Sequence, residues 1–120
     1  MAENIIKIKS FSFALRVVKM SQFFSAEKKE FVLSKQLLRS GTSIGALVRE
    51  SEHAESKSDF IHKLAIAQKE ANETSYWLEL LFQSEYLNQS QFESLHSELV
   101  EINKILASII ISTKRSLRKQ

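Results

Sequence analysis

Two pairs of residues in the chain have a spacing that is typical of metal ligands. Glu50 and His53, and again Glu93 and His96, are three positions apart, so each pair lies on one face of a helix. Helical bundles with a di-metal carboxylate site use two such Glu-x-x-His pairs and one further glutamate from each of the other two helices. This chemistry requires all four helices to bring ligands to one level of the bundle.

The expected helices keep the two pairs apart. One pair falls at the end of the second helix and the other near the start of the fourth, so the helix between them separates the pairs by on the order of 30 Å. The first helix has no acidic residue in its interior. We therefore expect no metal and no cofactor, and we interpret both histidines as polar surface positions.

Nucleophilic catalysis has no better support in the sequence. The three histidines, His53, His62 and His96, are scattered among many serines. No strained strand-to-helix turn presents a serine beside a base, as the hydrolase motifs require. We therefore expect that the protein is not an enzyme.

The only two glycines, Gly41 and Gly45, are four residues apart between apolar flanks. A phosphate-binding loop would need a preceding strand and a following Lys-Ser/Thr, and both are missing. A plain loop is the other alternative, because glycine in a helix interior costs about 1 kcal/mol relative to alanine. On a helix, however, such a pair makes a flat strip that a second backbone can approach closely. We predict this helix-packing role.

The segment KEANETSYWLELL, residues 69–81, places five polar or amphipathic side chains in register over two turns. They are Lys69, Glu70, Glu73, Tyr76 and Trp77. The spacing favours a solvated face with a Lys69–Glu73 pair at i, i+4. The alternative is a buried or interfacial polar network in which the Trp77 indole N–H is a donor.

Four segments have the apolar spacing of helices and position all of these residues. The seams are Ile8, Phe11, Leu15 and Val18 in the first helix; Leu37, Gly41, Ile44 and Val48 in the second; Phe60, Leu64, Ala67, Ala71, Thr74, Leu78 and Leu81 in the third; and Phe92, Leu95, Leu99, Ile102, Leu106 and Ile109 in the fourth. No segment alternates as a strand does. Short connections predict an all-α, antiparallel up-down-up-down four-helix bundle, with residues 1–120 as one domain.

Residues that accept hydrogen bonds from backbone N–H groups mark the expected helix starts. Ser25 is placed to cap the second helix. Ser56 with Asp59, and Ser90 with Glu93, have the form of capping boxes for the third and fourth helices.

The outer helices carry more apolar residues than one seam uses. The surplus consists of Ile5, Ile6, Phe13, Val17, Phe23 and Phe24 in the first helix and Ile105, Ile110 and Ile111 in the fourth. A helix on the surface of an isolated bundle usually keeps its outer face polar. Self-association would bury this surplus.

The composition limits the class of protein. The 120 residues include no cysteine and no proline, which excludes disulfides and thiolate metal sites and removes the strongest interruption to helices. The longest apolar run, residues 105–111, is far shorter than the ~20 residues that span a bilayer. The N-terminal segment is too rich in charge for a signal peptide. We expect a cytoplasmic protein with no membrane association.

Charge is distributed unevenly along the chain. Residues 1–49 have nine Lys/Arg and three Asp/Glu, residues 50–101 have three and eleven, and residues 102–120 have five and none. The bundle brings several basic residues to one end, where they are candidates for nucleic-acid binding: Lys7, Lys9, Lys114, Arg115, Arg118 and Lys119. Glu50, Glu52, Glu55 and Asp59 fall at the same end, so part of the asymmetry is expected to be pairing within the fold.

Residues 39–81, RSGTSIGALVRESEHAESKSDFIHKLAIAQKEANETSYWLELL, resemble the bacterial four-helix-bundle proteins named after open reading frames in intervening sequences of the 23S ribosomal RNA gene. Motif residues in the match whose role is undefined are Ser43, Glu50, Asp59, Lys69, Glu70, Glu73 and Trp77. The resemblance implies a cytoplasmic helical protein without catalytic activity that forms a ring-shaped homo-oligomer, a pentamer.

Two function hypotheses follow from these observations. In the first, a self-assembling bundle binds RNA, DNA or a ribonucleoprotein through a basic rim. In the second, it is a scaffold or accessory module for a protein partner, such as a retroelement reverse transcriptase, without direct nucleic-acid contact. The sequence itself does not separate the two.

Overall fold

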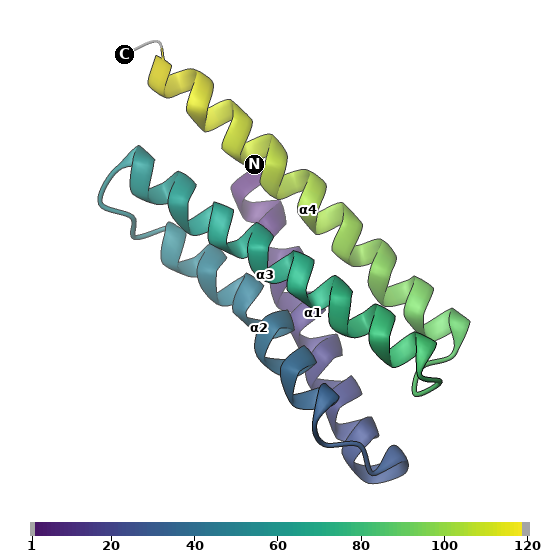
Figure 1. The fold of residues 1–120 in the computed structure, drawn as a ribbon. Coiled ribbons are helices and arrows are strands. Elements are labelled where there is room, and N and C mark those ends of the chain that lie inside the picture. Colours follow the sequence, from purple (N-terminus) through teal and green to yellow (C-terminus); the bar gives the residue numbers. More distant parts are fainter. Residues whose placement is uncertain (1, 119–120) are drawn as a thin grey trace.

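Four long helices account for most of the chain in the computed structural model, which describes residues 2–118 and the side chains from residue 4 onward (Figure 1). The helix α1 covers Ala2–Phe23 and continues into a π-helical turn, η1, at Phe24–Lys28. The other helices are α2 (Leu33–Ser51), α3 (Lys57–Gln83) and α4 (Gln89–Arg118). No strand occurs within residues 2–118. The predicted all-α four-helix bundle is confirmed.

Successive helices run in opposite directions along the long axis of a molecule that measures 53 × 22 × 20 Å (Figure 1). The helices α1 and α3 each contact both α2 and α4, and the contact between α1 and α4 is the least extensive of the four. The arrangement encloses one core. The buried apolar residues are Ile6, Phe13, Val17, Phe24, Leu37, Ile44, Val48, Leu64, Ala67, Ala71, Leu78, Leu81, Leu87, Leu95, Leu99, Ile102, Leu106, Ile109 and Ile110.

The predicted seam of α1 does not face the core, which corrects the sequence interpretation. Ile8, Phe11, Leu15 and Val18 are exposed, whereas Ile6, Phe13 and Val17 from the expected surplus are buried. Both sets of residues recur at helical spacing on the same helix, so periodicity alone did not identify the inner face. The seams expected for α2, α3 and α4 do line the core.

One of the three predicted helix caps is present in the structure, and the other two are not. The Ser56 cap is confirmed, because its Oγ accepts a hydrogen bond from the Asp59 N–H at 3.0 Å. Ser25 instead lies inside η1, which is followed by Lys29 with a left-handed φ of 54°. The predicted Ser90–Glu93 box is replaced by Asn88 and Gln91, whose side-chain oxygens each accept the other residue's backbone N–H at 2.8 and 3.0 Å.

Glu30 is the residue that caps α2. Its carboxylate accepts hydrogen bonds from the backbone N–H groups of Val32, Leu33 and Ser34 at 3.1, 2.8 and 2.8 Å. The side chain is almost fully buried, so the first turn of α2 receives its hydrogen bonds from protein rather than from water. This contact fixes the point at which the chain reverses direction between α1 and α2.

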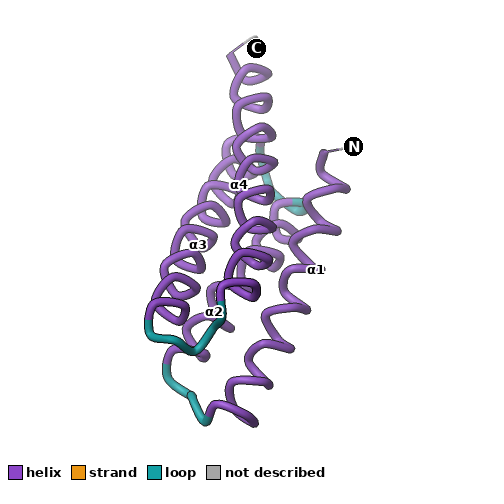
Figure 2. Tube along the Cα trace, turned by 90° about the vertical axis from the view of Figure 1, so that its right-hand side faces the viewer, coloured by secondary structure: helices purple, strands orange, loops and turns teal. Residues whose placement is uncertain are grey.

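The last turns of α4 extend beyond the rest of the bundle. Figure 2 shows them rising past the start of α1 and past the connection between α2 and α3. The Lys57 ammonium group donates a 2.7 Å hydrogen bond to Ser116 Oγ, which ties the start of α3 to this projecting segment. None of the helices described is long and apolar enough to cross a membrane.

Candidate functional site

The outer face of α1 is an exposed apolar stripe, here called the outer stripe, formed by Ile8, Phe11, Leu15 and Val18. Their side chains are 69%, 49%, 49% and 38% exposed, in that order. The steps of three, four and three residues align them along one helix face. Coiled-coil helices use the same spacing to pack against a partner helix. The outer stripe therefore has the spacing of a helix-packing surface, although no helix of this chain covers it.

A shallow groove of about 230 Å³ lies beside the outer stripe, between α1 and α2. It is lined by Phe11, Ala14, Thr42, Gly45, Ala46 and Arg49. Most of these residues are small, so a protruding side chain from a partner has room to enter. The Arg49 guanidinium, which also lines the groove, lies 5.0 Å from the centre of the Phe11 ring.

Both glycines lie inside α2 and face α1. A Cβ atom on Gly41 would lie 2.9 Å from Cγ2 of Val17, and one on Gly45 would lie 3.3 Å from the carbonyl oxygen of Ser10. Neither glycine has a positive φ, so the conformation of α2 does not itself require them. Their small size lets α1 and α2 lie close together, and Gly45 also lines the groove.

The basic residues at the C-terminal end of α4 are exposed. Lys114, Arg115 and Arg118 lie on the projecting turns, and none of them pairs with an acidic side chain among residues 4–118. Lys119 lies outside the described residues. The charge at this end is therefore available to an anionic partner.

The other two basic candidates are engaged within the fold. The Lys7 ammonium lies 3.2 Å from the Glu52 carboxylate, and Lys9 pairs with Glu101 on α4. Of the four acidic residues expected at this end, Glu52 is the one that pairs with a basic candidate in the part of the chain that the structure describes. Lys7 and Lys9 thus contribute less free charge to the basic end than the sequence suggested.

Several motif residues meet across the seam between α2 and α3. The Arg39 guanidinium bonds the Glu70 carboxylate at 3.2 Å and the Glu73 carboxylate at 2.6 Å. Ser43 Oγ donates to Glu70 at 3.2 Å, and the Trp77 indole N–H donates to Glu73 at 3.4 Å. Beneath them, the buried hydroxyls of Thr74 and Ser40 are 3.0 Å apart.

This arrangement is an interfacial polar network, the predicted alternative to a solvated face. Arg39 is the partner of Glu73, and the favoured Lys69–Glu73 pair is not formed in the described residues. The hydrogen bond from Arg39 is the largest reason why the pKa of Glu73 lies below its ordinary value. The contacts with Glu73 and Glu70 raise the pKa of Arg39 in turn, so the Arg39–Glu73 pair stays ionised at neutral pH. It fastens α2 to α3.

The remaining motif residues have separate positions. Lys69 is exposed on α3. Glu50 lies 3.8 Å from the Lys63 ammonium, and Asp59 accepts the Glu55 backbone N–H at 3.2 Å. His96 stacks on Phe92 with ring centres 5.2 Å apart. Among residues 2–118, no group of three or more histidine or acidic side chains is arranged to hold a metal ion.

Sequence reasoning missed three residues that organise these surfaces: Glu30, Arg39 and Arg16. The Arg16 guanidinium bonds Glu98 at 2.7 Å and Ser94 at 2.9 Å, which ties α1 to α4. Both arginines bond partners far along the chain, so local spacing could not reveal their contacts. Glu30 had a local signal, because it lies three residues before the first residue of α2.

A family model described as 23S rRNA-intervening sequence protein matches residues 2–108 of the chain. The comparison with curated proteins finds no match.

A solved structure matches the fold closely. It is the crystal structure, at 1.70 Å resolution, of a protein with unknown function from the S23 ribosomal protein family of Bacteroides thetaiotaomicron VPI-5482. The two chains are 58% identical, with a TM-score of 0.91, and the match covers 92% of this chain and 98% of the other. The four-helix fold is thus shared with a protein whose function is itself undefined.

Proposed function

The chain belongs to the 23S rRNA-intervening sequence protein family, and we propose that it acts in the cytoplasm as a non-enzymatic bundle that assembles into a ring and binds nucleic acid or ribonucleoprotein through a basic rim. The outer stripe of α1 is the observation that carries the proposal. Four large apolar side chains in helical register form a contiguous apolar surface, which a soluble chain normally covers with a partner.

A second copy of the chain is the partner that the proposal assigns to the outer stripe. The groove between α1 and α2 continues this apolar surface, and α4 exposes further apolar side chains at Val100 and Ile111. A closed ring requires each copy to contact two neighbours through two different surfaces. The outer stripe is one of these surfaces, and the exposed face of α4 is our assignment for the other.

The basic rim follows from assembly. One chain offers only a few unpaired cations at the end of α4, which would bind a polyanion weakly. Cyclic symmetry would repeat Lys114, Arg115 and Arg118 around one edge of the ring, and each phosphate that they neutralise would release counterions from the nucleic acid. Figure 2 shows the last turns of α4 projecting beyond the other helices, and Lys114, Arg115 and Arg118 on α4 are exposed. Binding is therefore expected to tolerate any sequence and to weaken steeply with salt.

Assembly is tested by placing charge in the outer stripe. The double variant Phe11→Glu, Leu15→Glu should be a folded monomer at a micromolar concentration where the wild type is an oligomer, as measured by light scattering after size exclusion. Ala65→Glu adds a carboxylate at an exposed position of α3 and should leave the mass unchanged. A monomeric wild type, or a double variant with the wild-type mass, would contradict the proposal.

Nucleic-acid binding is tested separately at the basic end. Changing Lys114, Arg115, Arg118 and Lys119 to glutamine should abolish the anisotropy change of a labelled RNA or DNA strand while helicity and mass stay the same. An equal loss of charge elsewhere, through glutamine at Lys19, Lys29, Lys35 and Lys69, should have little effect, because these exposed residues lie away from the projecting turns. If the wild type causes no anisotropy change of labelled RNA or DNA at low salt, the scaffold function for a protein partner replaces this part of the proposal.

A further inference from the structure

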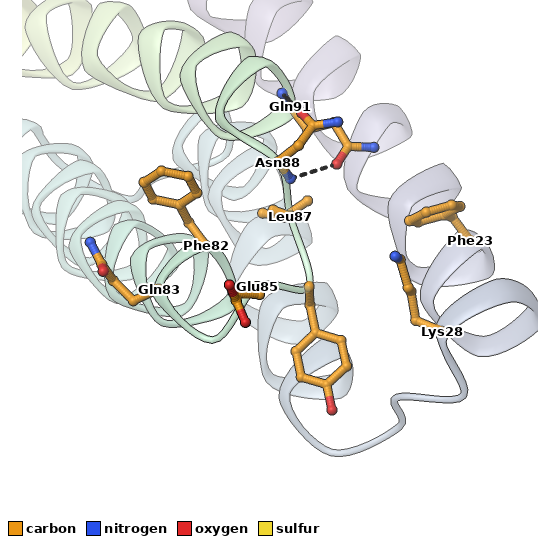
Figure 3. A pocket seen from close by; sticks show the side chains of 9 residues that line it. Phe23, Lys28, Phe82, Gln83, Glu85, Leu87, Asn88 and Gln91 are labelled. Carbon is orange, nitrogen blue, oxygen red and sulfur yellow. Dashed lines mark hydrogen bonds between the residues drawn. The ribbon is translucent and has the colours of Figure 1, made fainter.

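A cleft of about 560 Å³ opens at the end of the bundle opposite the basic C-terminal turns, between η1 and the connection from α3 to α4 (Figures 1 and 3). Its lining is Phe23, Lys28, Phe82, Gln83, Glu85, Tyr86, Leu87, Asn88 and Gln91. The volume is within the range of small-molecule sites. The lining combines three aromatic rings and one leucine with five polar or charged side chains. Neither the family match nor the proposed ring assigns a role to this cleft.

One side of the cleft presents hydrogen-bond donors. The Lys28 ammonium group lies 5.9 Å from the centre of the Phe23 ring and has no acidic partner among residues 4–118. Figure 3 shows Lys28, Phe23 and the amide of Gln91 on this side. An ammonium and an amide N–H beside an aromatic ring suit an anionic group that is attached to a flat molecule.

The orientation of the Gln91 amide is fixed by the cap of α4. Its oxygen accepts the Asn88 backbone N–H at 3.0 Å, so its NH₂ group remains the free end of the amide. The partial positive charge at the start of α4 adds to the attraction for an anion on this side. The donor is therefore held in place before a ligand arrives.

The other side of the cleft is acidic. Glu85 has a left-handed φ of 70° in the connection after α3, and Figure 3 shows its carboxylate next to Gln83, across Leu87 from Lys28. Leu87 is buried and forms an apolar floor between the two charges. The cleft thus offers a cation, then apolar and aromatic surface, then a carboxylate that accepts hydrogen bonds.

We propose that this cleft binds a nucleoside monophosphate whose base carries an amino group. The phosphate would contact Lys28 and Gln91 beside Phe23, the base would lie on the apolar surface at Leu87, and the exocyclic amine would donate to Glu85. The same chemistry is available from a free nucleotide and from the 5′-phosphorylated end of a strand. Because the cleft and the basic rim are at opposite ends of the bundle, this proposal does not depend on the proposed function.

The probe is AMP, with binding followed by calorimetry on the full chain. Lys28→Gln should weaken AMP binding about tenfold or more, the factor expected when one charge-assisted hydrogen bond is lost. Lys29→Gln removes the same charge from the next residue, which does not line the cleft, and should bind AMP as the wild type does. No heat with millimolar AMP, or equal losses in the two variants, would overturn the proposal.

The role of Glu85 is tested by a change of preference. IMP has a carbonyl oxygen where AMP has the amine, so the wild type should bind AMP several-fold more tightly than IMP. Glu85→Gln, which offers both a donor and an acceptor, should remove this preference and keep the Lys28 dependence. An unchanged AMP preference in Glu85→Gln would overturn the assigned orientation of the ligand.

Two further experiments separate the cleft from the basic rim, and free nucleotides from strand ends. In the variant without the four C-terminal charges, AMP binding should persist, which shows that the cleft acts apart from the rim. A 5′-phosphorylated trinucleotide that displaces AMP from this variant would identify strand ends as a source, and one that fails to displace it would identify free nucleotides.

Discussion

The two apolar faces of α1 consist of similar residue types, but one face is buried and the other is exposed. Phe13 and Phe11 are two residues apart and chemically identical, yet Phe13 is completely buried and Phe11 is half exposed. The inner face packs on α2 and the core, whereas the outer stripe faces solvent in the single chain. The comparison teaches that the inner face stabilises the fold of the single chain, and that the outer stripe contributes little to that core.

The largest effect is expected from removing one phenylalanine from each face. Phe13→Ala should lower the free energy of unfolding by about 3–5 kcal/mol, because it loses a large buried side chain and leaves a cavity. Phe11→Ala should cost well under half as much in the monomer, since the ring is already half in water. Urea unfolding of both variants measures the difference, in a background that Ile8→Glu, Leu15→Glu keeps monomeric without changing either phenylalanine. Equal losses would mean that the two faces do not differ as described.

The second test inserts a side chain where the inner face meets α2. Gly41→Leu should lower the free energy of unfolding by about 1–3 kcal/mol, the usual cost of overpacking, since even a Cβ atom there lies 2.9 Å from Val17. Gly41→Leu, Val17→Ala should recover part of the loss by removing the atoms that clash. The melting temperatures of the single and double variants measure this recovery. A double variant that is no more stable than Gly41→Leu would show that the clash is not with Val17.

The third test concerns the acidic cap that turns the chain from α1 into α2. Burial alone would raise the pKa of Glu30, but the hydrogen bonds from the N–H groups of Leu33, Ser34 and Val32 outweigh it and hold the pKa below its ordinary value of 4.5. A group with a lowered pKa in the folded state stabilises the fold above its unfolded pKa. This stability is lost as the pH falls through the lower folded pKa.

Glu30→Gln should therefore lower the free energy of unfolding by about 1 kcal/mol at pH 7, as the loss of other helix caps does. At pH 3 the decrease should be much smaller. Unfolding curves at the two pH values measure the change. The variant keeps one acceptor oxygen and tests the charge; Glu30→Ala removes the acceptor as well and should cost more at both pH values. A variant with the same deficit at pH 3 as at pH 7 would show that the carboxylate charge is not what stabilises the start of α2.

The smallest effect is expected at the ion pairs beside the outer stripe. Lys9 pairs with Glu101 and Arg16 with Glu98, and all four side chains are substantially exposed. Lys9→Met or Arg16→Met should change the free energy of unfolding by less than about 1 kcal/mol, and less still at high salt. A loss as large as that of Gly41→Leu would show that these pairs hold α1 against α4 more firmly than surface pairs normally do.

The sequence predicted the fold where one face of a helix is apolar and failed where two faces are. Leu37, Ile44 and Val48 formed a single seam in α2, and burial followed. In α1 the choice between Phe11 and Phe13 depended on how α2 and α4 pack around it, which local spacing does not contain. The excess of apolar residues was the usable signal, because it indicated that some of α1 would be left uncovered.

The polar residues show the same limit. The Ser56 cap was predictable because donor and acceptor are three residues apart. The network around Glu73 was not, because its cation, Arg39, lies 34 residues earlier and meets it only when α2 packs on α3. The cleft beside Lys28 and Gln91 likewise joins two connections that are distant in sequence.

The short connections between antiparallel helices also determine how the chain reaches this structure. Three of the four helix contacts join neighbours in sequence, so they form with little loop-closure entropy, and a chain rich in such contacts is expected to fold quickly. The contact between α1 and α4 closes nearly the whole chain, but the helices between them already hold its two ends near each other. The α1–α4 contact, which is the least extensive, is therefore expected to form late in folding. Substitutions in this contact should raise the unfolding rate more than they lower the folding rate.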